Sequence, residues 1–414
     1  MDTYINKENG DIHDYGVQVY FPYGDALDFF GKVNVTINER PPSARSPNRY
    51  VDFSTGGAVA YAEPDGQKGM EAVRKFHDLL VEKGYDKMTE PGYWNLPAGD
   101  KIPEDLLLPV GQFVRKYGLE AVLAVMYPST GGGAGSRGYF EDLMTLTLLK
   151  SFPAGWIKAA YLGDGKLYRV PGGNQRLYDR ISDILGSDVL YDTITADAER
   201  DDTGVKLVVK GKTGEKLIVA KKLLFAVQPT RENLAPFGLN EAEKKVFSKA
   251  KYGRSHTAIV SHPRLVPGTT LRNTPASALQ RPLAPFLTTP YVTSFGSYGN
   301  STRLFSLGAS GSDYATFDAA AAQALAQASL ERMAAAGVLA NLQGEKLHVV
   351  AWSDHEAGGF GASPEDMRAG WMRELYSLQG KRSTWFTGGG VASDFTTMLW
   401  KFNDDLLARV VKEW

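Results

Sequence analysis

The chain has 414 residues, enough for two or three domains, with 43% hydrophobic and 22% charged residues, as in ordinary globular proteins. Its formal net charge is −1, so we expect no nucleic-acid partner and no attraction to anionic lipid. The absence of cysteine excludes disulfides, thiolate catalysis and Cys-based metal sites.

Histidine usage and hydropathy narrow the possibilities further. The six histidines are scattered and include no H-E-x-x-H pair, so no metal site is expected. No apolar run reaches the roughly 18 residues of a transmembrane helix, so we expect no membrane span. The first residues, MDTYINKENGDIHDYG, are polar and acidic, unlike a secretory signal, and we expect a cytoplasmic location.

The N-terminal part of the chain favours β-strands. Residues 17–21, VQVYF, and residues 50–53 are rich in β-branched and aromatic side chains. The segment ERPPSARSPNRY between them has the proline and serine content of a loop. We therefore expect two strands within residues 1–60.

A mainly helical block is predicted to follow. Residues 66–83 carry apolar side chains at the spacing of one helix face, namely Met70, Val73, Phe76 and Leu80. Three further runs have a helical composition: residues 106–117, 119–126 and 140–152.

A glycine-rich stretch in this block matches the spacing of a dinucleotide-binding loop. Gly133, Gly135 and Gly138 form G-x-G-x-x-G. That motif needs a β-strand before it, a helix starting at its third glycine and an acidic residue roughly 20 positions later. Here the preceding GLEAVLAVMYP favours a helix, Pro128 intervenes, and SFPAGWIKAAYLGDG occupies the place of the acidic strand end. We interpret the stretch as a flexible loop rather than a nucleotide-binding loop.

Residues 168–230 alternate between helix and strand. Asn174 is placed to cap a helix that Gly186 ends. The apolar residues of this helix recur at i, i+4, i+7 and i+8: Leu177, Ile181, Ile184 and Leu185. Residues 205–209 and 217–219 alternate on either side of the turn GKTGE, as in a hairpin. Residues 223–227 are continuously apolar, which predicts a strand covered on both faces.

The last part of the chain is predicted to mix strands and helices. Residues 250–312 favour strands, residues 317–336 an alanine-rich helix, and residues 347–352 another strand. The segment RSTWFTGGGVASDFTTMLWKFNDDLLARVV predicts a short strand, a glycine-rich turn and a helix. The inner face of that helix is expected to consist of Leu399, Phe402, Leu406, Leu407 and Val410.

Three segments resemble the flavin-containing amine oxidases. RVPGGNQRLYDRIS, followed by a hairpin and KKLLFAVQPT, is similar to the middle portion of that family, in which a P-x-G-G turn opens a helix. Here the turn is shortened to Pro171-Gly172-Gly173. TWFTGGGVASDFTTMLWKFNDDLL resembles the family's last segment, and DYGVQVYF resembles a stretch that passes close to the flavin. The combination points to the fungal β-cyclopiazonate dehydrogenase-like branch, which serves secondary metabolism.

The start of the chain departs from the family pattern. Members begin with a βαβ unit that carries G-x-G-x-x-G, an acidic residue for the ribose and R-x-G-G, and none of these precedes Met1. The resemblance therefore implies either a fragment that lacks at least ~30 residues, the size of a βαβ unit, or a protein that has lost its pyrophosphate-binding loop. We expect the fragment, because the sheet would otherwise lack its central strand.

The resemblance implies FAD as the cofactor, without a cysteinyl link. Glycines let a backbone approach a flat ring, and a helix start offers free N–H groups with partial positive charge. The residues expected to contact FAD are Gly16, Val17, Ile194, Thr195, Gly388, Gly389, Thr397, Met398 and Leu399. For residues 388–389, the alternative to cofactor contact is an ordinary glycine-rich connection. For residues 194–195, it is ordinary hydrogen bonding within a sheet. Gly172 and Gly173 are expected to permit a tight helix entry rather than to bind the cofactor.

On the substrate side, Trp352 and His355 follow a predicted strand and are candidates to face the flavin, the alternatives being a core tryptophan and a surface histidine. No catalytic acid or base is assigned, since hydride transfer needs positioning and a dry pocket more than a proton donor.

The expected function is FAD-dependent oxidation of an amine-like or alkaloid-type small molecule. One alternative is an FAD-dependent isomerase or cyclase, and the other is a non-catalytic remnant. The expected fold is α/β, with a Rossmann-like FAD-binding domain of the amine oxidase type, incomplete at its N-terminus, and a second, α+β substrate domain. The first would comprise residues 1–60, 166–240 and 375–414, and the second residues 61–165 and 241–374.

Overall fold

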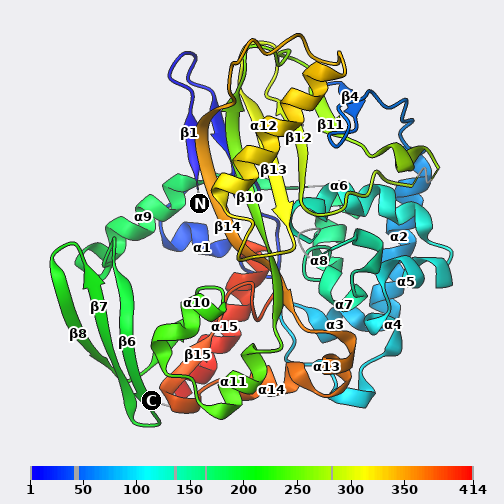
Figure 1. Ribbon diagram of the computed structural model, residues 1–414. Helices are drawn as coiled ribbons and strands as arrows, with labels where there is room; N and C mark the ends of the chain where they lie inside the picture. The colour runs from blue at the N-terminus through cyan, green and yellow to red at the C-terminus, as the bar shows by residue number, and fades with distance from the viewer. Residues whose placement is uncertain (1, 42–45, 135–137, 164–165, 281–282, 413–414) are drawn as a thin grey trace.

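A six-stranded sheet forms the upper part of the molecule in the computed structural model, which describes residues 2–41, 46–134, 138–163, 166–280 and 283–412 (Figure 1). Its strand order is β14-β10-β13-β12-β11-β4, and all neighbours are antiparallel except β11 and β4. The strands are β4 (Asn48–Val51), β10 (Lys251–Ser261), β11 (Thr270–Asn273), β12 (Tyr291–Ser297), β13 (Phe305–Gly311) and β14 (His348–Gly361). β14 is longer than the strand predicted at residues 347–352.

One face of this sheet is covered by helix α12 (Ala319–Ala335). The Asp318 side chain caps the helix by accepting a hydrogen bond from the Ala321 N–H at 2.8 Å. Its small alanines let the helix pack closely on sheet residues such as Phe295 and Phe305, which are fully buried. The predicted alanine-rich helix is therefore confirmed.

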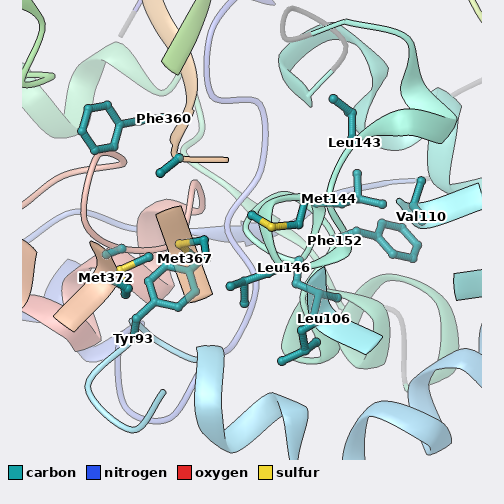
Figure 2. Packing of buried hydrophobic residues seen from close by; sticks show 14 of the residues in the cluster. Tyr93, Leu106, Val110, Leu143, Met144, Leu146, Phe152, Phe360, Met367 and Met372 are labelled. Carbon is teal, nitrogen blue, oxygen red and sulfur yellow. The ribbon is translucent and has the colours of Figure 1, made fainter. Parts of the chain in front are cut away.

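A helical block lies beside the sheet. It contains α2 (Gly66–Glu82), α3 (Tyr85–Thr89), α4 (Glu104–Leu107), α5 (Val110–Lys116), α6 (Leu123–Ala134), α7 (Thr145–Leu148) and α8 (Ala154–Ile157). The runs predicted at 106–117 and 140–152 are broken into short pieces. Pro109 separates α4 from α5 because proline cannot donate to the helix ladder. Figure 2 shows the apolar core of the block, where Leu106, Val110 and Phe152 pack together.

The glycine-rich stretch follows a helix rather than a strand. Gly133 belongs to α6, and Gly138 lies in a bend with φ +138°. Gly135 lies outside the described residues. A helix cannot feed a nucleotide-binding loop as a parallel strand does, so this stretch lacks the surroundings of such a loop. The expectation of a flexible loop is wrong for residues 131–133, because they continue α6 as helix.

The strand expected at residues 17–21 is absent. β1 (Thr3–Ile5) and β2 (Ile12–Asp14) form a hairpin, and the chain then runs on with a single bridge between Tyr20 and Tyr168. The Val17 carbonyl accepts instead from the Asn174 side chain at 2.8 Å, so this segment is held by a side chain rather than by a strand ladder.

Helix α9 (Gln175–Leu185) follows the Pro171-Gly172-Gly173 turn as predicted, but Asn174 does not cap it. The Asn174 side chain instead donates a hydrogen bond to the Val17 carbonyl and accepts one from the Val170 N–H. Ile184 and Leu185 are 52% and 46% exposed, so only the Leu177 end of the predicted apolar face is buried.

Two small sheets complete the lower left of the molecule (Figure 1). β7 (Gly204–Gly211) and β8 (Gly214–Ala220) form the expected antiparallel hairpin, and β6 (Ile194–Asp201) pairs antiparallel with the other edge of β7. β9 (Leu223–Phe225) pairs in parallel with β15 (Thr384–Phe386). Leu224 is 43% exposed, so the prediction that this strand is covered on both faces is wrong for part of β9.

Helix α15 (Thr396–Lys412) begins at the centre of the molecule and ends near the C-terminus (Figure 1). Phe402 and Leu406 are buried as predicted, but Leu407 is 46% exposed. The remaining elements are short: α1 (Asp28–Lys32), β3 (Asn38–Glu39), β5 (Tyr168–Arg169), α10 (Arg231–Leu234), α11 (Glu241–Phe247), α13 (Pro364–Arg368) and α14 (Trp371–Ser377). No helix in the described part of the chain is both long and apolar enough to cross a bilayer.

Candidate functional site

The carboxyl ends of β9 and β15 lie side by side and lead into a glycine-rich turn. We call residues 388–394 the glycine turn. Gly388 has φ +92°, and a Cβ atom there would lie 3.1 Å from the Ala226 carbonyl oxygen. A Cβ atom on Gly390 would lie 2.7 Å from the ring of Pro229. Glycine is therefore needed for the turn to pack against the chain that leaves β9. In open α/β sheets, ligands bind beside the carboxyl ends of parallel strands.

The start of α15 follows directly on the glycine turn. Thr397 and Met398 are buried, and Leu399 is half-buried. The Thr397 Oγ1 atom and the Gln228 Oε1 atom are both buried and have no hydrogen-bond partner among the described residues. The first N–H groups of a helix likewise have no partner inside it. These polar groups suit the oxygen- and nitrogen-rich edge of a flavin, so the residues present fit the implied cofactor.

Three aromatic rings pack at the entrance to α15. Phe395, the last residue before the helix, stacks on Trp156 with ring centres 4.9 Å apart. Phe21 meets Phe395 edge-on at 5.3 Å and Trp156 at 5.5 Å. They form an apolar cluster on this side of the helix start.

A second predicted contact segment, Gly16–Val17, lies against His355. A Cβ atom on Gly16 would be 3.6 Å from His355 Cε1. Thr257 on β10 joins the two, because its hydroxyl donates to the Tyr15 carbonyl and contacts His355 Nε2 at 2.8 Å. The structure thus brings together two predicted residues, Gly16 and His355, that lie more than 330 positions apart in sequence.

The hydrogen-bond pattern fixes the proton on His355. A hydroxyl has one hydrogen, and a carbonyl can only accept. The Thr257 hydrogen points to Tyr15, so His355 Nε2 carries a hydrogen and donates it to Thr257 Oγ1. The residue as a whole is exposed, yet desolvation of the ring lowers the pKa of His355 below its ordinary value and outweighs the opposite effect of a hydrogen bond to the Tyr15 main chain. The imidazole is consequently neutral at neutral pH.

Trp352 lies on the other face of the same sheet. It packs against the core beneath α12, and its ring lies 5.2 Å from that of His256. Neighbouring residues in a strand point to opposite faces, so His256 and Trp352 face the helix whereas Thr257 and His355 face residues 15–17. The two predicted substrate contacts are therefore separated by the sheet.

Ile194 and Thr195 also lie apart from the glycine turn. Ile194 is 68% exposed, and Thr195 pairs with Val209 of the neighbouring strand. The other end of β6 reaches β15, where Arg200 Nη1 donates to Thr384 Oγ1 at 3.1 Å. This contact is at the start of β15, whereas the glycine turn follows its end.

Gly172 and Gly173 serve the helix entry. Both have positive φ, and a Cβ atom on Gly173 would lie 2.3 Å from Thr3 Cγ2. Thr3 in turn accepts a hydrogen bond from the Gln175 N–H at 3.1 Å. At Gly172 a Cβ atom would lie 2.6 Å from Arg176 Nη1, so both positions suit the tight entry into α9.

Two charged residues near the glycine turn, Glu90 and Lys150, belong to no sequence motif and were not predicted. Both carboxylate oxygens of Glu90 accept from the Gly155 N–H, at 3.3 and 3.2 Å, and burial raises the pKa of Glu90 to about 7. The next residue, Pro91, accepts a hydrogen bond from the Ser393 N–H at 3.2 Å. Lys150 is buried at 5% exposure. Its position as a lone charge in the apolar run TLTLLKSF was the signal that could have revealed it.

No group of three or more His, Asp or Glu side chains in the described part of the chain could hold a metal ion.

The chain is similar in sequence to fungal FAD-dependent oxidoreductases. β-Cyclopiazonate dehydrogenase of Aspergillus oryzae is 29% identical over 408 residues, which cover 98% of this chain and 84% of the relative. The FAD-dependent oxidoreductase pigF of Monascus ruber is 29% identical over 391 residues, covering 93% of this chain and 78% of the relative. No protein-family model matches the chain. The resemblance expected from the three sequence segments is confirmed.

Solved structures establish the fold. A fatty acid isomerase from P. acnes that produces CLA superposes with a TM-score of 0.67 at 18% identity, covering 97% of this chain and 88% of that one. Putrescine oxidase bound to putrescine gives a TM-score of 0.60 at 14% identity, covering 99% and 90%. The fold is that of the FAD-binding amine oxidases, as predicted.

Proposed function

We propose that this chain, a homologue of fungal FAD-dependent oxidoreductases, binds FAD beside the glycine turn and oxidises an amine-like or alkaloid-type small molecule. The homologous relatives span nearly its whole length. One observation carries the placement of the cofactor. Two parallel strands end beside a glycine turn and the buried first turn of a long helix, and two buried polar atoms there lack partners.

FAD, when bound, supplies a flavin ring that accepts a hydride at N5. The start of α15 holds partial positive charge, which stabilises an anionic ring. Gly388 and Gly389 permit close approach of the backbone, while Thr397 Oγ1 and Gln228 Oε1 are available as hydrogen-bond partners. Phe21, Trp156 and Phe395 make this side of the proposed site apolar.

We place the substrate near residues 15–17 and His355, where the neutral imidazole holds its hydrogen at Nε2. The FAD-binding domain would comprise residues 1–60, 166–240 and 375–414, and the substrate domain residues 61–165 and 241–374. β4 pairs with β11 and so connects the first segment to the large sheet of the second domain. Leu399 stays a proposed contact of the flavin ring. Ile194 and Thr195, which lie apart from the glycine turn, stay proposed contacts of the adenine at the other end of FAD.

A flavin titration tests the proposal. The purified protein should bind added FAD, and an amine such as putrescine, benzylamine or tryptamine should bleach the visible flavin absorbance under anaerobic conditions. Turnover without bleaching would instead support an FAD-dependent isomerase or cyclase, a class that shares this fold through the fatty acid isomerase. A protein that ignores FAD would refute the proposed function.

A further inference from the structure

A buried lysine connects the helical block to the glycine turn. Lys150 follows α7, and its Nζ donates to the main-chain carbonyl of Phe360 at 3.2 Å and to that of Gly389. The carbonyl of Lys150 itself accepts from the Ser393 hydroxyl and from the Asp394 N–H, both at 3.2 Å. One residue thus holds the glycine turn near its beginning and at its end.

The next residue adds another link. The Ser151 hydroxyl donates to the Asp394 carboxylate at 2.6 Å. The end of α7 and the glycine turn are therefore joined by several hydrogen bonds, although they lie more than 230 positions apart.

The burial of this ammonium group is not required by packing. Its neighbours Leu148, Leu149 and Phe152 are core residues, and an apolar side chain would fill the same space at lower desolvation cost. Hydrogen bonds from a charged donor stabilise a structure more than neutral ones. The charge at this position therefore acts through the two carbonyls that it contacts.

We propose that Lys150 is a positioning residue that holds the glycine turn in its cofactor-binding conformation and supplies positive charge beside it. The proposal rests on the proposed function, in which this turn contacts FAD. Both the pyrophosphate and the reduced flavin of that cofactor are anionic, so a nearby ammonium favours binding and reduction.

Hydrogen exchange in the protein without cofactor tests the positioning role independently of FAD. K150M removes the charge and keeps the chain length. Amides of residues 391–394 should exchange roughly tenfold faster than in the wild type, the effect of losing one hydrogen bond from a charged donor. F113L, a core change in α5 whose ring packs on Phe76 and Tyr117, is the control for general loss of stability. Equal exchange at 391–394 in K150M and F113L would overturn the proposal.

FAD titration supplies the second measurement. K150M should raise the dissociation constant for FAD roughly tenfold or more over the wild type, and F113L should leave it within about threefold. The flavin midpoint potential should become more negative only in K150M. Unchanged affinity and potential in K150M, with a wild type that binds FAD, would refute this inference but not the proposed function. A wild type that fails to bind FAD would refute the proposed function, and the exchange result would still decide whether Lys150 positions the turn.

Discussion

Replacing Gly388 with alanine should weaken both folding and FAD binding. Gly388 has φ +92°, a backbone conformation that costs an L-amino acid about 1–2 kcal/mol. The new Cβ would also lie 3.1 Å from the Ala226 carbonyl oxygen, a backbone atom at the end of β9 that has little room to move. Adding ~1 kcal/mol for this overpacking, we expect G388A to lose about 2–3 kcal/mol of unfolding free energy.

The matched control is G337A. Gly337 has φ +74° beyond the end of α12, and nothing lies within 4 Å of a Cβ atom there. G337A should lose only the backbone term, about 1–2 kcal/mol, without altering cofactor affinity. Urea unfolding gives the two stabilities, and flavin fluorescence gives the dissociation constants. In G388A the constant should rise roughly tenfold, which equals about 1.4 kcal/mol. Equal FAD affinity in the two variants would refute the assigned role of the glycine turn.

Three further predictions concern the groups around the site. Because the folded pKa of Glu90 is raised to about 7, its protonation stabilises the fold fully below pH ~4.5, and this contribution is lost as the pH rises through 7. The stability of E90Q relative to wild type should thus increase by about 2–3 kcal/mol between pH 4.5 and pH 8, whereas a constant difference would contradict this. R200M should lose about 3 kcal/mol in urea unfolding, since it removes one of the two arginines that pair with the buried carboxylate of Glu243 and leaves the other, Arg382, in place, and an unchanged stability would contradict this. Nitrogen NMR at pH 8 should show the hydrogen of His355 on Nε2, and a hydrogen on Nδ1 would overturn the hydrogen-bond assignment.

Periodicity predicted the long elements of the fold well and the short ones poorly. α2, predicted from its apolar stripe, and α12, predicted from its alanine content, each lie within about two residues of their predicted bounds. α15 lies in the segment for which a C-terminal helix was predicted. The strand predicted at 17–21 failed because composition alone cannot show whether a partner strand is available. In the structure, the Asn174 side chain takes the Val17 carbonyl that such a partner would use.

The candidate site could be predicted only where a segment resembles a known family. Gly388 and Thr397 became candidates because their segment resembles the last segment of the amine oxidases, since the glycines and the helix start alone also fit a plain connection. His355 meets Gly16 only through the pairing of β10 with β14, which a single sequence does not reveal. Lys150 makes its contacts with main-chain carbonyls of distant segments, and these have no sequence signature apart from a charge in an apolar run.

The central claim is that FAD binds where β9 and β15 end beside the start of α15. Hydrogen exchange with and without FAD tests this most directly. The cofactor should slow exchange in residues 14–18, 226–229 and 387–399, and leave β7, β8 and α12 unchanged. Binding of FAD without slower exchange at residues 14–18, 226–229 or 387–399 would contradict the account.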